Sequence, residues 1–500
     1  MPLRTKQAYI NSIRSLRTVL WAYGQPVDDM YEHPCFKPAM DAIGLVYALT
    51  RNDGKTETEG FFTAPSPFVG SRVSRFLHIH QTREDLDSRF RLSRYLVRRH
   101  GACIGARCVS TSSLNAVFAT THDMDRANGT DYHARFLSFL RHVQENDLAV
   151  AGAMMDVKGD RGLRPHEQAD PDLYLRVVDH TPEGIVVRGA KASISGAAIA
   201  EEIVVVPCTA LGPEDEQYAV GFAVPSDAPG ILHVAEAPSP NMRRLLGTEM
   251  DYGNARYGVH GSTHVIFNDV FIPKERVFMC GEYAWAGSLV DRFASLQRLN
   301  TTSCKTGHRD LLIGAAAVAA DFNGVGTARH IREKIADLHH HSETAFGCAL
   351  ASIYTGEKTA SGVFMPNPLY VNIAKHQGVA AIWKGTYMAA DIAGGIVCTL
   401  PTADDLTSET IGEVIDKYFR GRNDVSTENR IRILRLVEYL TGQGSVVPVE
   451  STHGAGSPQA QTIIIQQDLS RKITGFKNDA KIMAGIKTDG DTGKNEGNIS

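Results

Sequence analysis

Residues 291–324 read DRFASLQRLNTTSCKTGHRDLLIGAAAVAADFNG, and the rest of the chain is interpreted outward from them. The first half is amphipathic, and residues 311–320 form an Ala-rich apolar run typical of a buried helix. Cys304 lies where the halves meet, seven residues after Gln297, and seven residues are close to two helical turns. In a continuous helix Gln297 and Cys304 therefore share one face, which fits a wall of a reaction centre. On spacing alone the same face also fits ordinary core packing.

The composition is that of a folded, soluble protein. Of 500 residues, 43% are hydrophobic and 22% are charged, and this length predicts two or three packed parts. The formal net charge is −4 and no basic stripe is present, so nucleic acid is not an expected partner. No apolar run reaches about eighteen residues, which excludes a conventional membrane span. The N-terminus lacks the apolar region and cleavage site of a secretory signal.

The eight cysteines are scattered along the chain and contain no CxxC pair. This scatter is unlike a disulfide framework and fits the reducing cytoplasm, which is the expected location. It also gives no support to a zinc ribbon.

The hydrophobic period changes twice along the chain. Residues 1–150 are mainly helical in pattern, and 151–282 contain short β-branched runs bounded by Gly, Pro, Asp or Asn. Residues 283–475 return to helical spacing, and 476–500 form a polar tail. The prediction is an α+β fold with an N-terminal helical domain, a middle antiparallel β domain and a C-terminal helical bundle. This is the layout of acyl-CoA-dehydrogenase-like flavoproteins, an analogy at the level of fold.

The glycine-rich stretch HGAGSPQAQ at 453–461 is the main candidate for a cofactor contact. Its glycines permit close backbone approach and its Ser and Gln side chains supply donors, which suits a pyrophosphate or flavin edge; a plain interhelical loop fits the same residues. Gly394 and Gly395 are a second, weaker candidate. No Walker A or strand–GxGxxG–helix unit is present, which disfavours P-loop and Rossmann sites. The candidates in the stretch are His453, Gly454, Gly456, Ser457 and Gln459.

Glu450 and Lys305 are the acid–base candidates. Glu450 precedes the glycine-rich stretch and Lys305 follows Cys304. A carboxyl buried beside a cofactor has a raised pKa and can shuttle protons, whereas an exposed Glu at a helix end is the alternative.

Six long blocks, spread over roughly residues 5–487, resemble the 4-hydroxyphenylacetate 3-hydroxylase superfamily, and within it most closely the 4-hydroxybutyryl-CoA dehydratase branch. The resemblance implies the three-part fold, non-covalent FAD and a homotetramer. It also implies that the 453–461 stretch contacts flavin, and that Ser195 lies near the reactive ring nitrogen. Further implied flavin contacts are Ala153, Met154, Met155, Lys158 and Ser193. The blocks are QENDLAVAGAMMDVKGDRG, VVRGAKASISG, NDVFIPKERVF, CKTGHRDLLIGAAAVAADFNG, DIAGGIVCTLP and ESTHGAGSPQAQ.

The resemblance also implies a four-iron, four-sulfur cluster held by a Cys-x3-Cys pair and a His-x6-Cys pair. Cys108 and Cys304 match two ligands, but Gln297 stands at the histidine position, and a carboxamide is a poor iron ligand. Ile104 stands at the first cysteine position, with Cys103 one place too early. In a helix, residues four apart point about 40° apart and residues five apart about 140°, so only non-helical backbone would bring Cys103 into place.

Two further departures fall in the dehydratase site. Thr301 replaces a tyrosine and Ser262 stands near an active-site glutamate position, while Lys305 and Glu450 are retained. We therefore expect a kept flavin site and a dismantled cluster site, so that no metal ligand set is assigned.

The expected function is a FAD-dependent oxidoreductase without a cluster, acting on a small organic or acyl substrate such as a CoA thioester or a phenol. It would carry out monooxygenation with reduced flavin or substrate oxidation, with Glu450, Lys305, Gln297 and Thr301 at the reaction centre. A separate flavin reductase is an expected partner of the monooxygenase version, because no NAD(P)H fingerprint exists. One alternative is a dehydratase with an altered cluster on Cys103, Cys108 and Cys304, and another is a catalytically silent flavin-binding scaffold subunit.

Overall fold

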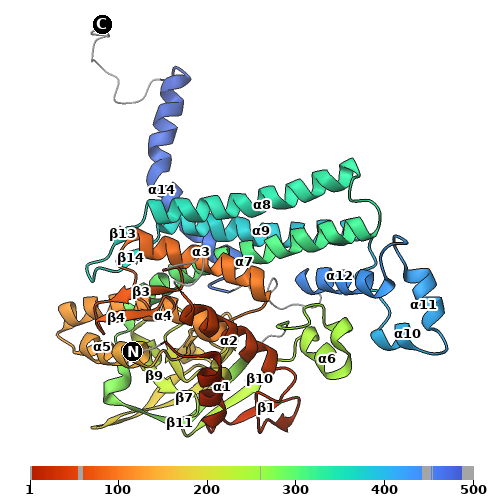
Figure 1. The fold of residues 1–500 in the computed structure, drawn as a ribbon. Coiled ribbons are helices and arrows are strands. Elements are labelled where there is room, and N and C mark those ends of the chain that lie inside the picture. Colours follow the sequence, from red (N-terminus) through yellow and green to blue (C-terminus); the bar gives the residue numbers. More distant parts are fainter. Residues whose placement is uncertain (1–2, 54–59, 259–260, 442–451, 453, 487–500) are drawn as a thin grey trace.

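The computed structural model describes residues 3–53, 60–258, 261–441, 452 and 454–486. Long C-terminal helices lie above a β region that the N-terminal helices flank (Figure 1). The predicted α+β order of helices, then mostly antiparallel sheets, then a helical bundle is confirmed.

The N-terminal part is mainly helical, and its helix starts follow local sequence signals. Thr82 and Asp85 form a capping box at the start of α3, each side chain accepting from the other's backbone N–H. Asp131 precedes α5, whose apolar stripe of Phe136, Phe139, Leu140 and Val143 is buried. The helices are α1 (Lys6–Ser15), α2 (Lys37–Arg51), α3 (Arg83–His100), α4 (Gly105–Asn128) and α5 (Tyr132–Glu145).

Two sheets form the β region. The larger has the order β2-β1-β10-β11-β7-β6 and is antiparallel except for β1 beside β10; the smaller has the order β12-β9-β8-β5, with β5 parallel to β8. Strands β1 and β2 come from the N-terminal part, which the helical pattern there did not predict. The strands are β1 (Leu20–Ala22), β2 (Gln25–Pro26), β5 (Val150–Ala153), β6 (Arg176–Thr181), β7 (Gly184–Ser195), β8 (Glu202–Val205), β9 (Val220–Pro225), β10 (Ile231–Ala235), β11 (Ser262–Pro273) and β12 (Val277–Cys280); β3 (Thr63–Ser66) and β4 (Ser71–Ser74) form a separate hairpin.

The C-terminal part is built on α7, a continuous helix of 40 residues. The Ala-rich run at 311–320 is not buried on all sides, because Gly314 and Val318 are exposed; the deeply buried section lies earlier, at 293–309. Helix α14 extends into the predicted polar tail as far as Met483. The remaining helices are α6 (Ser239–Leu246), α7 (Tyr283–Phe322), α8 (Arg329–Tyr354), α9 (Pro368–Ile392), α10 (Ala403–Thr407), α11 (Gly412–Phe419), α12 (Thr427–Leu440) and α14 (Pro458–Met483), and β13 (Glu357–Lys358) pairs with β14 (Phe364–Met365).

Three apolar clusters hold these parts together. One joins the N-terminal helices to both sheets, a second fills the far end of the helical bundle, and a third joins α3 and α7 to α8 and α9. Helix α7 contributes to all three, and its buried polar section lies where α3 and α4 pack against it. Among the described helices, none is both long and apolar enough to cross a bilayer.

Candidate active site between helices α4 and α7

Three residues form a partly exposed stripe on the most buried section of α7. From Phe293 to Arg309 every residue is buried except Gln297, Thr301 and Cys304. Their spacing of four and then three residues places them on one face of a continuous helix. The predicted shared face of Gln297 and Cys304 is therefore confirmed, and Thr301 lies between them.

Helix α4 presents a second thiol to this face. Cys108, at the first turn of α4, is partly exposed, while 110–121 are buried throughout. Burial raises the pKa of the Cys108 thiol to about 11, and the neighbouring Cys304 raises it further, while Arg89 and Lys305 oppose the shift. Cys108 is therefore a protonated thiol at neutral pH, adjacent to Cys304.

Gln297 is held in place by α4. Ser112, one turn after Cys108, donates its hydroxyl proton to Gln297 Oε1 at 2.8 Å. In the described part of the chain no group accepts a hydrogen bond from Gln297 Nε2. Ser112 therefore orients the Gln297 carboxamide: Oε1 already accepts a hydrogen bond, and Nε2 can donate to another group.

Cys103 does not belong to helix α4. The helix begins at Gly105, and Ile104 before it has φ −119° and ψ 47°, which is neither helical nor extended backbone. The expectation was that only non-helical backbone would bring Cys103 into place, and the backbone at Cys103 is non-helical. Cys103 lines a small cavity of about 10 Å³ that Ser195 and Ser262 also line.

The side chains present do not fit a four-ligand cluster. Within the described ranges no group of three or more His, Cys, Asp or Glu side chains is close enough to hold a metal ion. Gln297 and Ile104 occupy the two remaining positions implied by the resemblance, and Ile104 is buried. A carboxamide and an aliphatic side chain cannot replace imidazole and thiolate as iron ligands.

Positive charge surrounds the two thiols. Arg89 is buried and donates only to neutral groups, namely Thr111, Ser93 and the carbonyl of Cys108. Burial lowers the pKa of Arg89 to about 10, and the two thiols counteract this. Lys305 is buried, and no described side chain forms an ion pair or hydrogen bond with its ammonium. Buried cations without carboxylates favour an anionic or strongly electron-rich group nearby.

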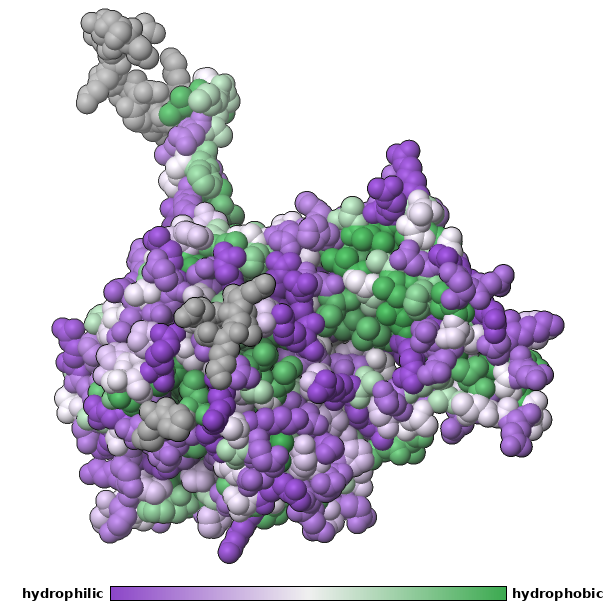
Figure 2. All heavy atoms as spheres, in the orientation of Figure 1, coloured by the Kyte–Doolittle hydropathy of each residue, from purple (hydrophilic) through white to green (hydrophobic). Residues whose placement is uncertain are grey.

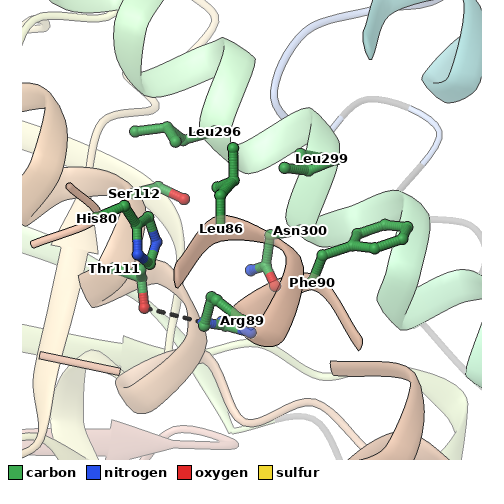
Figure 3. Close-up of a pocket in the computed structure, with 9 residues that line it drawn as sticks. All are labelled: His80, Leu86, Arg89, Phe90, Thr111, Ser112, Leu296, Leu299 and Asn300. Atoms are coloured by element: carbon green, nitrogen blue, oxygen red, sulfur yellow. Dashed lines mark hydrogen bonds between the residues drawn. The ribbon is translucent and has the colours of Figure 1, made fainter. Parts of the chain in front are cut away.

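A small cavity with both polar and apolar lining lies between α3, α4 and α7 (Figure 3). It measures about 20 Å³, room for roughly one water molecule. His80 lines it, buried and with Nδ1 unpartnered, together with Arg89 from α3 and Ser112 from α4. Burial lowers the pKa of His80 well below its ordinary value, so this imidazole is neutral.

The β region meets the start of α4 at close range. A Cβ on Gly105 would lie 2.2 Å from Ser195 Cβ, and one on Gly152 would lie 2.5 Å from Val109 Cγ1. Ser193 and Ser195 are both partly exposed, and Ser193 has a φ of +53°. The predicted flavin contacts of β7 therefore lie against the same end of α4 as Cys108.

The segment after β5 is fixed by a buried ion pair. Lys191 of β7 pairs with Asp156 and donates to the carbonyl of Met154 at 3.1 Å. Ala153 is buried, Met154 and Met155 are partly exposed, and Lys158 is exposed. The backbone of 154–156 is thereby held beside β7, as a flavin contact requires.

The glycine-rich stretch is held by helix α7 at the residue next to Gln297. Arg298, adjacent to Gln297, donates through Nε to Ala455 O and through Nη1 to Asn372 Oδ1, both at 2.9 Å. Ala455 and Gly456 have φ of +61° and +100°, and a Cβ on Gly456 would lie 2.9 Å from Arg298 Nη2. Gly454 and Ser457 are partly exposed and Gln459 is exposed, whereas Glu450 and His453 lie outside the described residues.

Gly394 and Gly395 lie elsewhere in the chain. They end α9, with φ of +85° and +76°. Asn372, which contacts Arg298, lies about 30 Å away along the same helix, since each residue adds about 1.5 Å. Within one chain these glycines are not part of the group around Gln297.

Several groups that organise this site were not predicted. Arg298, Arg89, Ser112 and Asn372 orient other side chains or the glycine-rich stretch. A signal was present for Arg298, because a charged residue in a section otherwise typical of a buried helix must find partners. For Arg89 and Ser112 no local signal existed.

Family models for the N-terminal and C-terminal parts of 4-hydroxyphenylacetate 3-hydroxylase match residues 5–279 and 286–485. The chain belongs to this family. It is 38% identical to the 4-hydroxybutyryl-CoA dehydratase/vinylacetyl-CoA-Delta-isomerase of Clostridium aminobutyricum, over 97% of this chain and 100% of that protein. A solved oxygen-tolerant archaeal 4-hydroxybutyryl-CoA dehydratase from N. maritimus is 39% identical, with a TM-score of 0.93 over 99% of this chain and 97% of the other.

Monooxygenases of the family are more distant. The oxygenase component (HpaB) of 4-hydroxyphenylacetate 3-monooxygenase, solved with FAD and 4-hydroxyphenylacetate, is 22% identical, with a TM-score of 0.80 over 96% of this chain and 100% of that one. At this identity the likeness shows the shared fold alone. The resemblance inferred from the six sequence blocks is confirmed.

Proposed function

We propose that this family member is a FAD-dependent oxidoreductase that works without an iron–sulfur cluster, on a small acyl substrate of the CoA-thioester kind. The reaction centre is the stripe of Gln297, Thr301 and Cys304 with Cys108 opposite. The proposal rests on what occupies this partly exposed face. Two positions that would hold cluster ligands carry Gln297, which accepts a hydrogen bond from Ser112, and the buried Ile104, so these ligands are missing.

FAD fits the residues that converge on this face. The backbone of 154–156, the partly exposed Ser193 and Ser195, and the positive-φ turn at 455–456 held by Arg298 form the cradle. The HpaB structures solved with FAD support the same assignment. FAD, when bound, exchanges electrons with a substrate or, once reduced, with oxygen.

The side chains of the face have separate roles. Gln297 donates through Nε2 to a substrate oxygen, and Thr301 supplies a hydroxyl beside it. Lys305 and Arg89 lower the energy of negative charge that develops on an acyl substrate, because both are largely buried cations that pair with no carboxylate of the described ranges. Cys108 remains a neutral donor because its pKa is raised to about 11. Glu450, retained at a family acid–base position, moves protons.

An acyl substrate is favoured over a phenol by two considerations. The dehydratase relatives, which are named for a CoA thioester, are 38–39% identical to this chain. Relatives named for 4-hydroxyphenylacetate 3-monooxygenase, which acts on a phenol, are 21–25% identical to it. Buried positive charge also suits an enolate-like acyl group.

In the monooxygenase version of the reaction a separate flavin reductase is the partner, and a homotetramer is the proposed assembly.

The second candidate is a dehydratase with an altered cluster. The observation that favours it is the non-helical backbone at Cys103. The side chain of Cys103 therefore need not point about 140° away from that of Cys108, as it would in a continuous helix. The third candidate, a silent scaffold subunit, predicts that no turnover accompanies bound flavin.

Cofactor analysis of the protein purified without oxygen separates these candidates. We expect FAD in the visible spectrum with neither iron nor sulfide; stoichiometric iron and sulfide would establish the dehydratase candidate instead. A matched control is the double variant Gln297→His/Ile104→Cys, which restores both missing ligand types and should take up iron on reconstitution. Bleaching of the flavin by a panel of acyl-CoA thioesters, without oxygen, then tests substrate oxidation. No bleaching, and no oxygen uptake with reduced FAD, leaves the scaffold candidate.

A further inference from the structure

Strand β7 contains a bulge where it passes the site. Two residues of β7, Ala192 and Ser193, lie opposite the single residue His264 of β11, because the register of the two strands shifts here. A bulge of this kind interrupts the β-ladder and re-aims the side chains next to it. It lies between Lys191, which holds the segment after β5, and Ser195, which contacts the start of α4.

The backbone N–H groups of the bulge find their partners outside the β-ladder. Ala192 N donates to Met155 O at 2.9 Å, in the segment proposed to contact flavin. Ser193 N donates to His264 Nδ1 at 3.3 Å. A backbone N–H must be paired, and at Ser193 an imidazole ring takes the place of the ladder carbonyl.

Ser193 needs such a partner because its backbone conformation is unusual. Its φ of +53° lies in the left-handed region, which residues other than glycine seldom adopt. A residue stays in this region only where the surrounding structure holds it there. Since φ is the rotation about the N–Cα bond, the hydrogen bond that fixes the direction of Ser193 N–H restrains this angle directly.

His264 lies on the sheet face that the site uses. Ser262 of β11 pairs with Ser195 of β7, so these two side chains point to one face. His264 follows Ser262 by two residues and therefore points to the same face. Thr263 between them points to the opposite face, where its hydroxyl contacts His233 in the core. Both core residues are fully buried, whereas His264 is partly exposed.

We propose that His264 is a positioning residue for FAD. Its Nδ1 holds Ser193 in the left-handed conformation that presents this residue to the flavin. Nδ1 accepts the hydrogen bond only while it carries no proton, so the proton of the ring is on Nε2. The inference rests on the proposed FAD site and extends it to a residue of β11.

The expected effect on flavin binding is moderate because water competes for the same N–H. His264 and Ser193 are both partly exposed, and Figure 2 shows a mainly hydrophilic surface over the β region. Water therefore replaces part of the lost acceptor, and removal of Nδ1 should weaken FAD binding about tenfold rather than a thousandfold.

His264→Asn and His264→Leu form a matched pair of variants. The side-chain oxygen of Asn can occupy the place of Nδ1 and accept from Ser193 N, whereas Leu has a similar shape and no acceptor. In fluorescence titration of the full-length protein stripped of flavin, we expect His264→Leu to raise the dissociation constant of FAD about tenfold and His264→Asn to change it less than about twofold. His180→Leu, at an exposed position of β6, is the control and should bind FAD as the parent does.

Amide hydrogen exchange of the flavin-free protein tests the contact itself. The N–H of Ser193 should exchange about tenfold faster in His264→Leu than in the parent, and at the parent rate in His264→Asn. If circular dichroism shows that His264→Leu does not fold, His264→Gln replaces it, because its oxygen lies one bond farther from the backbone than Nδ1.

Unchanged exchange at Ser193 in His264→Leu, or FAD affinity equal to that of the parent, overturns the role of His264 and leaves the FAD site standing. Equal losses in His264→Leu and His264→Asn would mean that the ring acts by packing and not through Nδ1, which also overturns it. A parent chain that binds no FAD contradicts the proposed function, and with it any role of His264 toward flavin.

Discussion

Cys108 and Cys304 are neighbouring thiols with different surroundings, and the surroundings decide their chemistry. Cys108 is enclosed by α3, α4 and α7, and its backbone carbonyl accepts from both Arg89 and Asn300. Burial is the largest cause of its raised pKa of about 11, and two nearby cations do not overcome it. A nucleophilic thiolate at Cys108 is therefore excluded near neutral pH.

The alkylation rate of Cys108 tests this assignment. A thiol with a pKa of about 11 carries roughly a hundredfold less thiolate at pH 8 than one with the ordinary value of 9.0. We expect iodoacetamide to label Cys108 in the Cys304→Ser variant about a hundredfold more slowly than in the same protein unfolded in urea. The rate should rise as the pH approaches 11, because the thiolate forms only then. Mass spectrometry measures both; equal rates at pH 8 would refute the raised pKa.

Lys305 is a largely buried lysine without a charge partner among the described residues. The residue is 9% exposed, and in the described ranges no group forms a hydrogen bond or ion pair with its ammonium. Lys305→Met removes a buried charge and keeps the aliphatic volume, so we expect stability to rise by about 1–3 kcal/mol in urea unfolding while turnover falls at least tenfold. Lys384→Met is the control, because Lys384 is half-exposed and paired with Asp337. A loss of stability in Lys305→Met would mean that the lysine is structural.

At the scale of elements, the start of α4 is positioned by its contact with the end of β7. Gly105 and Ser195 are in backbone contact there, with the added Cβ of an alanine 2.4 Å from Ser195 O. A backbone atom cannot swing aside as a side-chain tip can, so any side chain at 105 must separate the two elements. This separation disturbs the region that holds Cys108 close to the predicted flavin contacts.

Gly105→Ala should therefore weaken flavin binding at least tenfold and lower stability by about 1–3 kcal/mol. Gly347→Ala, in α8, is the matched control because a Cβ there meets no atom within 4 Å. By helix propensity alone it should raise stability by about 0.5–1 kcal/mol and leave flavin affinity unchanged. Flavin titration by fluorescence and urea unfolding measure both effects. Unchanged affinity in Gly105→Ala would show that this contact does not shape the flavin site.

Sequence periodicity was sufficient where the geometry is local. One helix relates Gln297, Thr301 and Cys304 by spacing alone, so their shared face could be predicted from residues 291–324. Helical spacing does not decide the position of Cys103, because helix α4 begins only at Gly105. Where the helix starts depends on the packing of Gly105 on Ser195, a contact between residues far apart in sequence.

At the scale of the whole molecule, the unpredicted features are those that join distant segments. Strands β1 and β2 extend a sheet whose other members follow residue 175, and β1 joins it by pairing Leu20 with His233. Arg89 and Ser112 reach the site from α3 and α4, and neither lies in a recognisable motif. The order of helical, β and helical parts was predictable because it needs only the hydrophobic period, whereas these contacts require the folded chain.

The buried ion pair of Arg107 and Asp147 is one such junction, and it links α4 to the strand β5 that leads into the site. Arg107 is fully buried, and its Nη2 donates to Asp147 Oδ1 at 2.9 Å while Nη1 donates to Leu148 O at 2.9 Å. Asp147 has a φ of +45°, a conformation that Asn also tolerates. Asp147→Asn therefore removes the charge without straining the backbone.

We expect Asp147→Asn to lower the free energy of unfolding by about 3–5 kcal/mol, because it leaves an uncompensated guanidinium in the core. The chain offers a matched control in Asp269, which has a φ of +52° and pairs with Arg188 but is 51% exposed. Asp269→Asn should cost less than about 1 kcal/mol, since a solvated ion pair contributes little. Urea unfolding followed by both circular dichroism and flavin fluorescence makes the comparison. Equal costs for the two variants would mean that the buried pair does not hold α4 to β5, and that the position of Cys108 depends on the Gly105 contact alone.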